Sequence, residues 1–140
     1  MAAILMITTI ASAKANTDKP IRFEQLPNIS KEFIRKYFNE KDISYAKVDT
    51  DFFDKSYEVF FVNGSKVEFD KKGDWEEINC LHNGIPAEII PVQIMKYIEK
   101  NHSNLSIVKI ERDSRDYEIK FNNNLEIKFD LKFNVIEYDH

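Results

Sequence analysis

The chain has 140 residues, of which 43% are hydrophobic and 13% aromatic, with 20 basic and 24 acidic side chains. This composition argues against wholesale disorder and supplies enough apolar side chains for one compact unit or two very small ones. The mildly acidic balance and the lack of a basic stripe argue against a nucleic-acid-binding protein.

The first predicted element is an export signal. Residues 2–13 are apolar or small and carry no charge, and the "AKA" of residues 13–15 has the small-x-small form of a signal-peptidase site. We predict a signal peptide over residues 1–15, cleaved after Ala13 or Ala15, and a periplasmic or secreted mature chain. The apolar run is too short to span a bilayer, so we expect no stable membrane insertion after cleavage. Because no Lys or Arg precedes the run, we expect that the start codon has been assigned too late; the alternative is a buried N-terminal helix.

A helix is predicted next, in the stretch "SKEFIRKYF" (residues 30–38). Phe33, Ile34 and Tyr37 fall on one face of this stretch at helical spacing, which is typical of a helix that packs on a core. Ser30 is the predicted N-cap.

Two hairpins follow the helix. The stretches "YEVFFV" (residues 57–62) and "KVEFD" (residues 66–70) alternate apolar and polar residues, which predicts two strands with one face in the core. The Asn63-Gly64 pair between them predicts a tight primed hairpin turn. In "DKKGDW", which follows directly, Gly73 is expected to take the left-handed conformation of a second hairpin turn.

Residues 80–85 are the predicted connector to the second half of the chain. Cys80 is the sole cysteine, which excludes an intrachain disulfide. We predict that it is a small buried hydrophobic residue without a catalytic role.

The pattern of the first half then returns with an offset of sixty residues. Residues 26–79 align with residues 86–139 without a gap. The matching pairs include Ile34/Ile94, Tyr37/Tyr97, Val48/Val108, Tyr57/Tyr117, Glu58/Glu118, Phe61/Phe121, Asn63/Asn123, Phe69/Phe129, Asp70/Asp130 and Glu77/Glu137. So many aromatic matches in one register indicate a tandem duplication.

The second copy differs from the first at its turns. Pro91 is predicted at the first helical position, where its missing N–H does no harm. Three asparagines (residues 122–124) stand in place of the Asn-Gly turn. Phe133 occupies the place that Gly73 has in the first copy, so we predict a longer or shifted turn there.

We therefore predict an α+β fold, in which two tandem helix-plus-four-strand repeats (residues 22–79 and 86–140) form one curved antiparallel sheet with helices on one face. One such unit alone would be marginal, because a chain of its size buries only about 60% of its unfolded surface. Joining two units edge to edge also removes an exposed strand edge.

Several stretches together resemble a known family. An "LP" (residues 26–27) precedes "FIRKYF", the strand "YEVFF" follows, and "VEFDKKGDW" (residues 67–75) has the pattern apolar-x-Phe-Asp-x-x-Gly-x-Trp. With the export signal and the second copy, residues 22–140 resemble the PepSY-like exported bacterial proteins, also described as β-lactamase-inhibitor-like. The resemblance implies a β-lactamase-inhibitor-protein-like fold with a concave sheet face left open, and functions in protein binding or peptidase inhibition. It implies no catalytic residues.

The sequence offers little for catalysis or metal binding. His82, His102 and His140 lack partners at metal-ligand spacing. The aspartates in "VDTDFFD" (residues 48–54) resemble part of a calcium loop, but the Gly and the distal Glu of an EF-hand are missing, so we interpret them as a solvated strand end and its loop. These aspartates are Asp49, Asp51 and Asp54. Without a Gly-x-Ser-x-Gly nucleophile or a Gly-rich phosphate loop, we expect no enzyme activity and no cofactor.

Aromatic side chains on a charged sheet face are candidate anchors for a protein partner. Phe60 falls on the polar side of its strand and Trp75 lies near a strand end; the alternative is that both pack under the helices or against the other half. The remaining candidates for this binding face are Glu58, Lys66, Glu68, Glu118, Lys120 and Lys128. Glu58 and Glu68 alternate with Lys66 on this face, and we expect these charges to be used in cross-strand pairing.

The sequence thus predicts a non-enzymatic exported binding module, protein-binding or peptidase-inhibitor-like, that uses its open sheet face. Its partner would be an unknown protein or peptide of the cell envelope. The alternative is a periplasmic protein that binds or senses a small ligand, an ion or a peptide, and such a protein needs a closed pocket with a few convergent polar groups.

Overall fold

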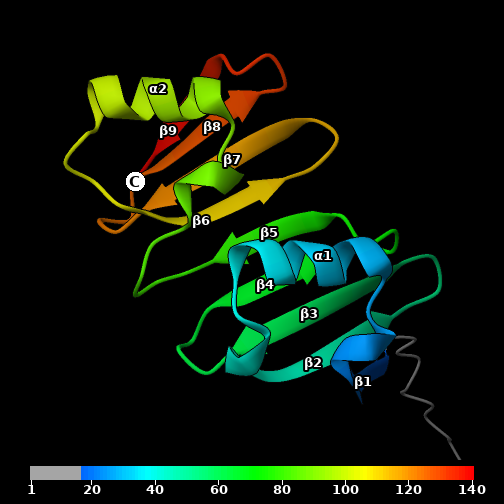
Figure 1. The fold of residues 1–140 in the computed structure, drawn as a ribbon. Coiled ribbons are helices and arrows are strands. Elements are labelled where there is room, and N and C mark those ends of the chain that lie inside the picture. Colours follow the sequence, from blue (N-terminus) through cyan, green and yellow to red (C-terminus); the bar gives the residue numbers. More distant parts are fainter. Residues whose placement is uncertain (1–16) are drawn as a thin grey trace, which may run out of the picture.

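The computed structural model describes residues 17–140, so the signal peptide predicted over residues 1–15 lies outside the described residues. Two helices and nine strands make up most of the described chain (Figure 1). Their order is β1 (Thr17–Ile21), α1 (Asn28–Tyr37), β2 (Ile43–Thr50), β3 (Lys55–Phe61), β4 (Lys66–Phe69), β5 (Trp75–Asn79), α2 (Val92–Asn101), β6 (Ile107–Arg112), β7 (Asp116–Phe121), β8 (Glu126–Asp130) and β9 (Val135–Asp139). Three short 3₁₀ turns, η1 (Phe23–Gln25), η2 (Glu40–Asp42) and η3 (Ala87–Ile89), precede α1, β2 and α2.

The strands form one open sheet in which each strand pairs antiparallel with the next along the chain, from β1 to β9. The predicted α+β class and the single antiparallel sheet are confirmed. Strand β1 was not predicted, and it extends the sheet by pairing with β2. The two halves meet where β5 pairs with β6, through Glu77↔Glu111, Ile78↔Ile110 and Asn79↔Lys109.

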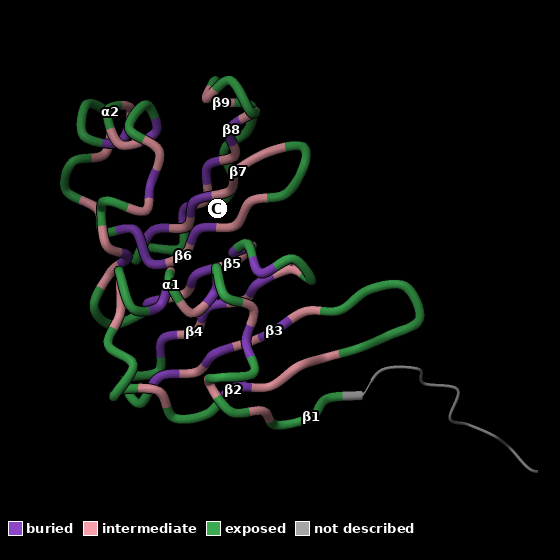
Figure 2. The backbone as a smooth tube through the Cα atoms, turned by 45° about the vertical axis from the view of Figure 1, so that its right-hand side comes forward, coloured by how far each residue is buried: buried purple, intermediate pink, exposed green. Residues whose placement is uncertain are grey.

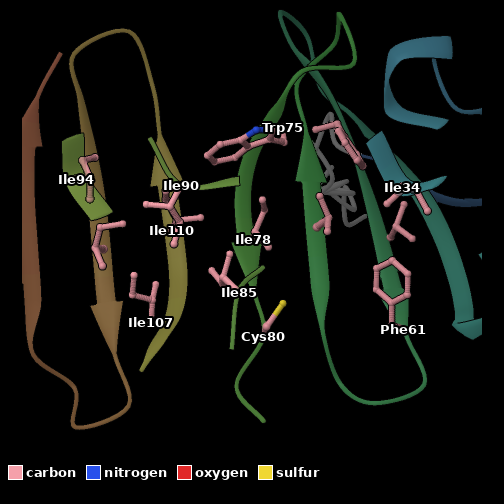
Figure 3. Close-up of a cluster of buried hydrophobic side chains, with 14 of the residues drawn as sticks. Ile34, Phe61, Trp75, Ile78, Cys80, Ile85, Ile90, Ile94, Ile107 and Ile110 are labelled. Atoms are coloured by element: carbon pink, nitrogen blue, oxygen red, sulfur yellow. The ribbon is translucent and has the colours of Figure 1, made fainter. Parts of the chain in front are cut away.

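The core lies between the helices and one face of this sheet. Alternate residues of the strands point toward it, and those in the middle of the sheet are fully buried, as the tube in Figure 2 shows for the central strands. The side chains with 0% exposure include Val59, Val67, Ile78, Ile110, Ile119 and Ile127. Ile34 of α1 and Ile94 of α2 are equally buried in the same cluster, so both helices cover one face of the sheet. Cys80 is buried in this core, as predicted (Figure 3).

Helix α1 begins three residues before, and helix α2 one residue after, the predicted position. Helix α1 starts at Asn28 with Pro27 as its N-cap, so the prediction of Ser30 as N-cap is wrong. The backbone carbonyl of Pro27 already accepts hydrogen bonds from the amides of the first turn. Ser30 is instead fully buried, and its hydroxyl donates a 2.8 Å hydrogen bond to the carbonyl of Gly73. Likewise, Pro91 is the N-cap of α2 and not its first helical residue.

The β3–β4 turn is a three-residue loop and not the predicted primed turn. The Phe61 amide donates to the Ser65 carbonyl and the Gly64 amide donates to the Phe61 carbonyl. Gly64 has a φ of 89°, but Asn63 does not have a positive φ, whereas a type I′ turn requires positive φ at both central residues. The β7–β8 turn closes in the same way, with Asn124 at a φ of 70°.

The β8–β9 turn is neither longer nor shifted, contrary to the prediction. Its amide-to-carbonyl hydrogen bonds from Phe133 to Asp130 and from Asp130 to Asn134 repeat those of the β4–β5 turn. In this turn Phe133 takes a φ of 69°, where the β4–β5 turn has Gly73 at 96°. The ring of Phe133 is half-buried and lies 5.6 Å from the ring of Tyr117, and we infer that this packing offsets the strained backbone.

We predict that Gly73→Ala destabilises the protein much more than Gly64→Ala. Both glycines have positive φ, which costs an alanine about 1–2 kcal/mol. A Cβ at Gly73 would also lie 2.7 Å from Pro27 Cβ and 2.8 Å from Ile29 Cγ1, whereas at Gly64 its nearest neighbour is His82 at 3.7 Å. Urea unfolding should show a loss of about 2–5 kcal/mol for Gly73→Ala. Equal losses for the two variants would contradict the close packing of α1 on this turn.

Candidate binding face

The face of the sheet opposite the helices, here called the open face, carries most of the predicted site residues. Phe60 and six charged candidates alternate with core residues along β3, β4, β7 and β8, and each of them is half-buried. The six are Glu58, Lys66, Glu68, Glu118, Lys120 and Lys128. No helix of the described chain covers this face.

Trp75 is the exception, because it lies on the helix side of the sheet (Figure 3). The register shifts between Glu68 and Phe69, so that Trp75 pairs with Phe69 and points into the core with 8% exposure. The Arg112 guanidinium lies 3.8 Å from the centre of the Trp75 ring, and its Nε donates a 2.8 Å hydrogen bond to the Trp75 carbonyl. The prediction that Trp75 lies on the binding face is therefore wrong, and the register shift beside it is the reason.

The strand register aligns five glutamates across the middle of the open face. Successive strands pair Glu58 with Glu68, Glu68 with Glu77, Glu77 with Glu111, and Glu111 with Glu118. We call these five residues the glutamate row. Residues directly opposite in an antiparallel pair have Cβ atoms about 4.5–5.5 Å apart, and like charges at that distance destabilise the sheet. The row ends in lysines, because Glu58 faces Lys47 on β2 and Glu118 faces Lys128 on β8.

Lysines neutralise three of the five carboxylates. Glu58 lies 3.7 Å from Lys47 and 3.6 Å from Lys66, and the second of these contacts is the predicted cross-strand pair. The Lys66 ammonium also lies 3.4 Å from Glu77. Lys109 pairs with Glu111 at 2.7 Å. Glu68 and Glu118 have no ion pair within the described residues, so the predicted cross-strand charge pairing does not extend to Glu68.

These two carboxyl groups have strongly raised pKa values. Burial raises the pKa of Glu68 to about 7, and the charges of Glu58 and Glu77 add to the shift. Burial likewise raises the pKa of Glu118 to about 7, followed by contributions from Glu126 and Glu111. Near neutral pH each of the two groups therefore exists as a mixture of the neutral acid and the carboxylate.

The open face is hollowed along this row. A shallow pocket of about 380 Å³ extends over strands β4 to β8, with four of the five row glutamates in its lining. Its other lining residues are Glu76, Arg112, Asp113, Arg115, Asp116 and Lys128. Acidic side chains outnumber basic ones in the lining by seven to three. Each cation also has an acceptor: the Trp75 carbonyl for Arg112, Asp113 for Arg115 and Glu137 for Lys128. The pocket therefore presents carboxylates to any partner that enters it.

A pair of stacked aromatic rings lies beside one end of the row. The rings of Tyr45 and Phe60 are 4.5 Å apart and nearly parallel, at 11°. Tyr45 is 50% exposed, and the Lys47 ammonium lies 5.8 Å from the centre of the Phe60 ring. Tyr45 was not among the residues predicted for this face, because its place opposite Phe60 depends on a register shift between Ile43 and Tyr45.

The three aspartates that resembled a calcium loop do not converge. The Asp51 carboxylate accepts hydrogen bonds from the amides of Phe53 and Asp54, and so closes the β2–β3 turn. Asp49 faces Ser56 on the neighbouring strand. This hairpin extends beyond the rest of the sheet (Figure 2), with Phe52 and Phe53 exposed at its tip. Within residues 17–140, no group of three or more His, Cys, Asp or Glu residues is arranged to hold a metal ion.

The chain is similar to a known family and to solved bacterial structures. The sequence model of the family described as "Putative beta-lactamase-inhibitor-like, PepSY-like" matches residues 55–137. No curated protein shows significant similarity to the chain. Among helices of the described residues, none has both the length and the apolar character needed to cross a membrane.

Three crystal structures of Bacteroides proteins have the same fold. A "putative calcium-regulated periplasmic protein" from Bacteroides thetaiotaomicron is 50% identical, with a TM-score of 0.85, over 88% of this chain and 97% of that one. A "putative periplasmic protein" from Bacteroides vulgatus is 47% identical, with a TM-score of 0.85, over 93% and 99% of the two chains. A "putative periplasmic protein of unknown function" from the same species is 34% identical, with a TM-score of 0.83, over 89% and 100%.

We predict that Glu68→Gln stabilises the protein at about pH 8, by about 0.2–1 kcal/mol, because it removes a like charge that faces Glu58 and Glu77. The pKa of Glu68 is about 7 in the folded protein, above its ordinary value of 4.5. Folding therefore takes up a proton between these pH values, and the free energy of unfolding falls as the pH rises from about 4.5 to about 7. Part of this fall should disappear in the variant.

The measurement is urea unfolding at a series of pH values. Glu111→Gln is the matched control, since it removes a row carboxylate that has its own ion pair with Lys109, and we expect no gain in stability from it. An unchanged pH dependence in Glu68→Gln would contradict the raised pKa of Glu68.

Proposed function

The chain belongs to the PepSY-like, β-lactamase-inhibitor-like family, and from this premise we propose that it is a non-enzymatic periplasmic module that binds another protein or a peptide on its open face. The periplasmic location is supported by the descriptions of its solved relatives and by the uncharged apolar segment that opens the sequence. A peptidase-inhibitor-like role is one form that this binding could take.

The single observation that carries this proposal is the stack of half-buried Phe60 on exposed Tyr45, on a broad sheet face that no described helix covers. Sheet surfaces exposed to water normally carry polar residues, and a stacked aromatic pair there has the composition of an interface anchor. The pocket over the glutamate row is shallow and polar, whereas a small-molecule site is typically enclosed and mostly apolar. The geometry therefore favours a macromolecular partner over the small-ligand alternative.

We further propose that residues 22–79 and 86–140 are two copies of one PepSY-like repeat, joined by residues 80–85. The support is geometric: each half consists of a helix followed by four antiparallel strands. The pairs Val59↔Val67 and Ile119↔Ile127 are related by the sixty-residue offset, and so are the turns that connect these strands.

Calcium regulation is a second candidate function, because one solved relative is described as calcium-regulated. The observation that favours it here is the presence of two row carboxylates, Glu68 and Glu118, that no lysine neutralises in the described chain. Carboxylate oxygens are the ligands that calcium prefers, but the described residues hold no ready-made coordination group. Binding would therefore be weak, with a dissociation constant on the order of 10⁻³ M.

The partner-binding proposal predicts that Tyr45→Ala with Phe60→Ala abolishes capture of a specific protein. The experiment is a crosslinking pull-down from envelope extracts of the native host, with residues 16–140 as bait. The matched control is Ile29→Ala with Val92→Ala, which also removes two exposed hydrophobic side chains, but from the two helices. We expect the wild type and the control to capture the same protein and the open-face variant to lose it. Recovery by all three folded proteins would contradict the proposal.

The calcium proposal predicts that calcium raises the melting temperature of the wild type and not that of the Glu68→Gln, Glu118→Gln double variant. Removing both carboxylates takes away the only row ligands without an ion pair among the described residues. Thermal unfolding in calcium chloride, with magnesium chloride and sodium chloride at equal ionic strength as controls, measures the effect. An equal shift in all three salts would indicate charge screening and rule out a specific calcium effect.

A further inference from the structure

The glutamate row lowers the stability of the isolated protein, compared with the same fold without opposed like charges. Four successive cross-strand pairs place like charges directly opposite each other, where neighbouring strands ordinarily pair opposite charges. The adjacent line of Lys66 and Lys109 neutralises only part of the row, and Glu68 and Glu118 have no ion pair in the described chain. A ligand that brings positive charge to this row would relieve the repulsion.

We propose that the partner on the open face is a cationic segment of another protein, whose lysine or arginine side chains enter the pocket over the glutamate row. This inference rests on the proposed function and names the chemistry of its partner. Charge complementarity supports this partner, because seven acidic side chains and only three basic ones line the pocket.

The two unpaired carboxylates are well placed for such a segment. Glu68 lies on β4 and Glu118 on β7, with two strands between them. Neighbouring strands are about 4.8 Å apart, so the backbones of the two strands are separated by about 14 Å across the sheet. Two cationic side chains of one peptide segment can span that distance.

The Tyr45–Phe60 stack extends this surface toward β2. The Tyr45 ring is 50% exposed and can contact a further cation of the segment, since Arg and Lys side chains bind aromatic rings. The same surface disfavours the other macromolecules that bind charged faces. Nucleic acid and anionic lipid both carry phosphates, which the row would repel.

The test measures binding of a fluorescent oligolysine of about ten residues to residues 16–140, by anisotropy at about pH 8 and about 0.05 M salt. We expect saturable binding that weakens by about fivefold to tenfold in Glu68→Gln with Glu118→Gln, the value for two partly exposed ion pairs. The control is Glu32→Gln with Glu99→Gln, which removes the same charge from exposed positions on α1 and α2. It should leave the affinity within about twofold of the wild type.

The pH dependence provides a second readout. Because the pKa values of Glu68 and Glu118 are raised to about 7, lowering the pH from about 8 to about 6 should weaken binding to the wild type more than to the row variant. Groups that face these two carboxyls are Glu58, Glu77, Glu76 and Lys66 around Glu68, and Glu111, Glu126 and Lys128 around Glu118. Circular dichroism confirms that each variant is folded.

Two results would overturn the inference: equal weakening in the row variant and the helix control, or no saturable binding of oligolysine by the wild type. The proposed function can hold even if this inference fails. If the protein captured from envelope extracts is lost with Tyr45→Ala, Phe60→Ala but binds the row variant as well as the wild type, the open face is still a binding face and the cationic partner is wrong.

Discussion

The pairing of β5 with β6 is the interaction on which the rest of this structure depends. It places Ile78 opposite Ile110 and thereby continues the buried apolar face from the first half of the chain into the second. Because side chains alternate along a strand, the same register places Glu77 opposite Glu111 on the other face. The core and the glutamate row are therefore two consequences of one hydrogen-bonded junction.

Much of the fold can be read from the sequence, because alternation and helical spacing are local signals. They assign Val59, Val67 and their second-half counterparts to the core, and the charged residues between them to the opposite face.

The errors come from features that local signals do not contain. Trp75 points into the core because the β4–β5 pair shifts register beside it, and Ser30 is recruited by the carbonyl of Gly73, forty-three residues away. Phe133 takes a positive φ, which its residue type disfavours, and the packing of its ring against Tyr117 offsets this cost.

Several residues of the candidate site were predicted from the sequence, but their alignment in one row across the sheet was not. Glu58, Glu68 and Glu118 were candidates, whereas Glu77 and Glu111 were not, because only the strand register shows that all five are aligned. One signal could have shown part of the row. Val59 and Val67 both belong to the core face, which excludes a two-residue turn and favours a three-residue loop centred on Asn63, and that loop places Glu58 opposite Glu68. The junction between the halves has no such local marker, since a helix and a connector separate β5 from β6.

The position of the row above the core explains why its repulsion persists in the folded protein. A sheet with like charges opposite each other could relax by a one-residue slip, but such a slip would turn the fully buried isoleucines toward water and the glutamates toward the helices. Burying even two or three such side chains is worth more than the repulsion of neighbouring carboxylates. The core thus holds the carboxylates in an arrangement that they would not adopt on their own. Charges fixed in this way need no reorganisation when a partner of opposite charge arrives, which lowers the cost of binding.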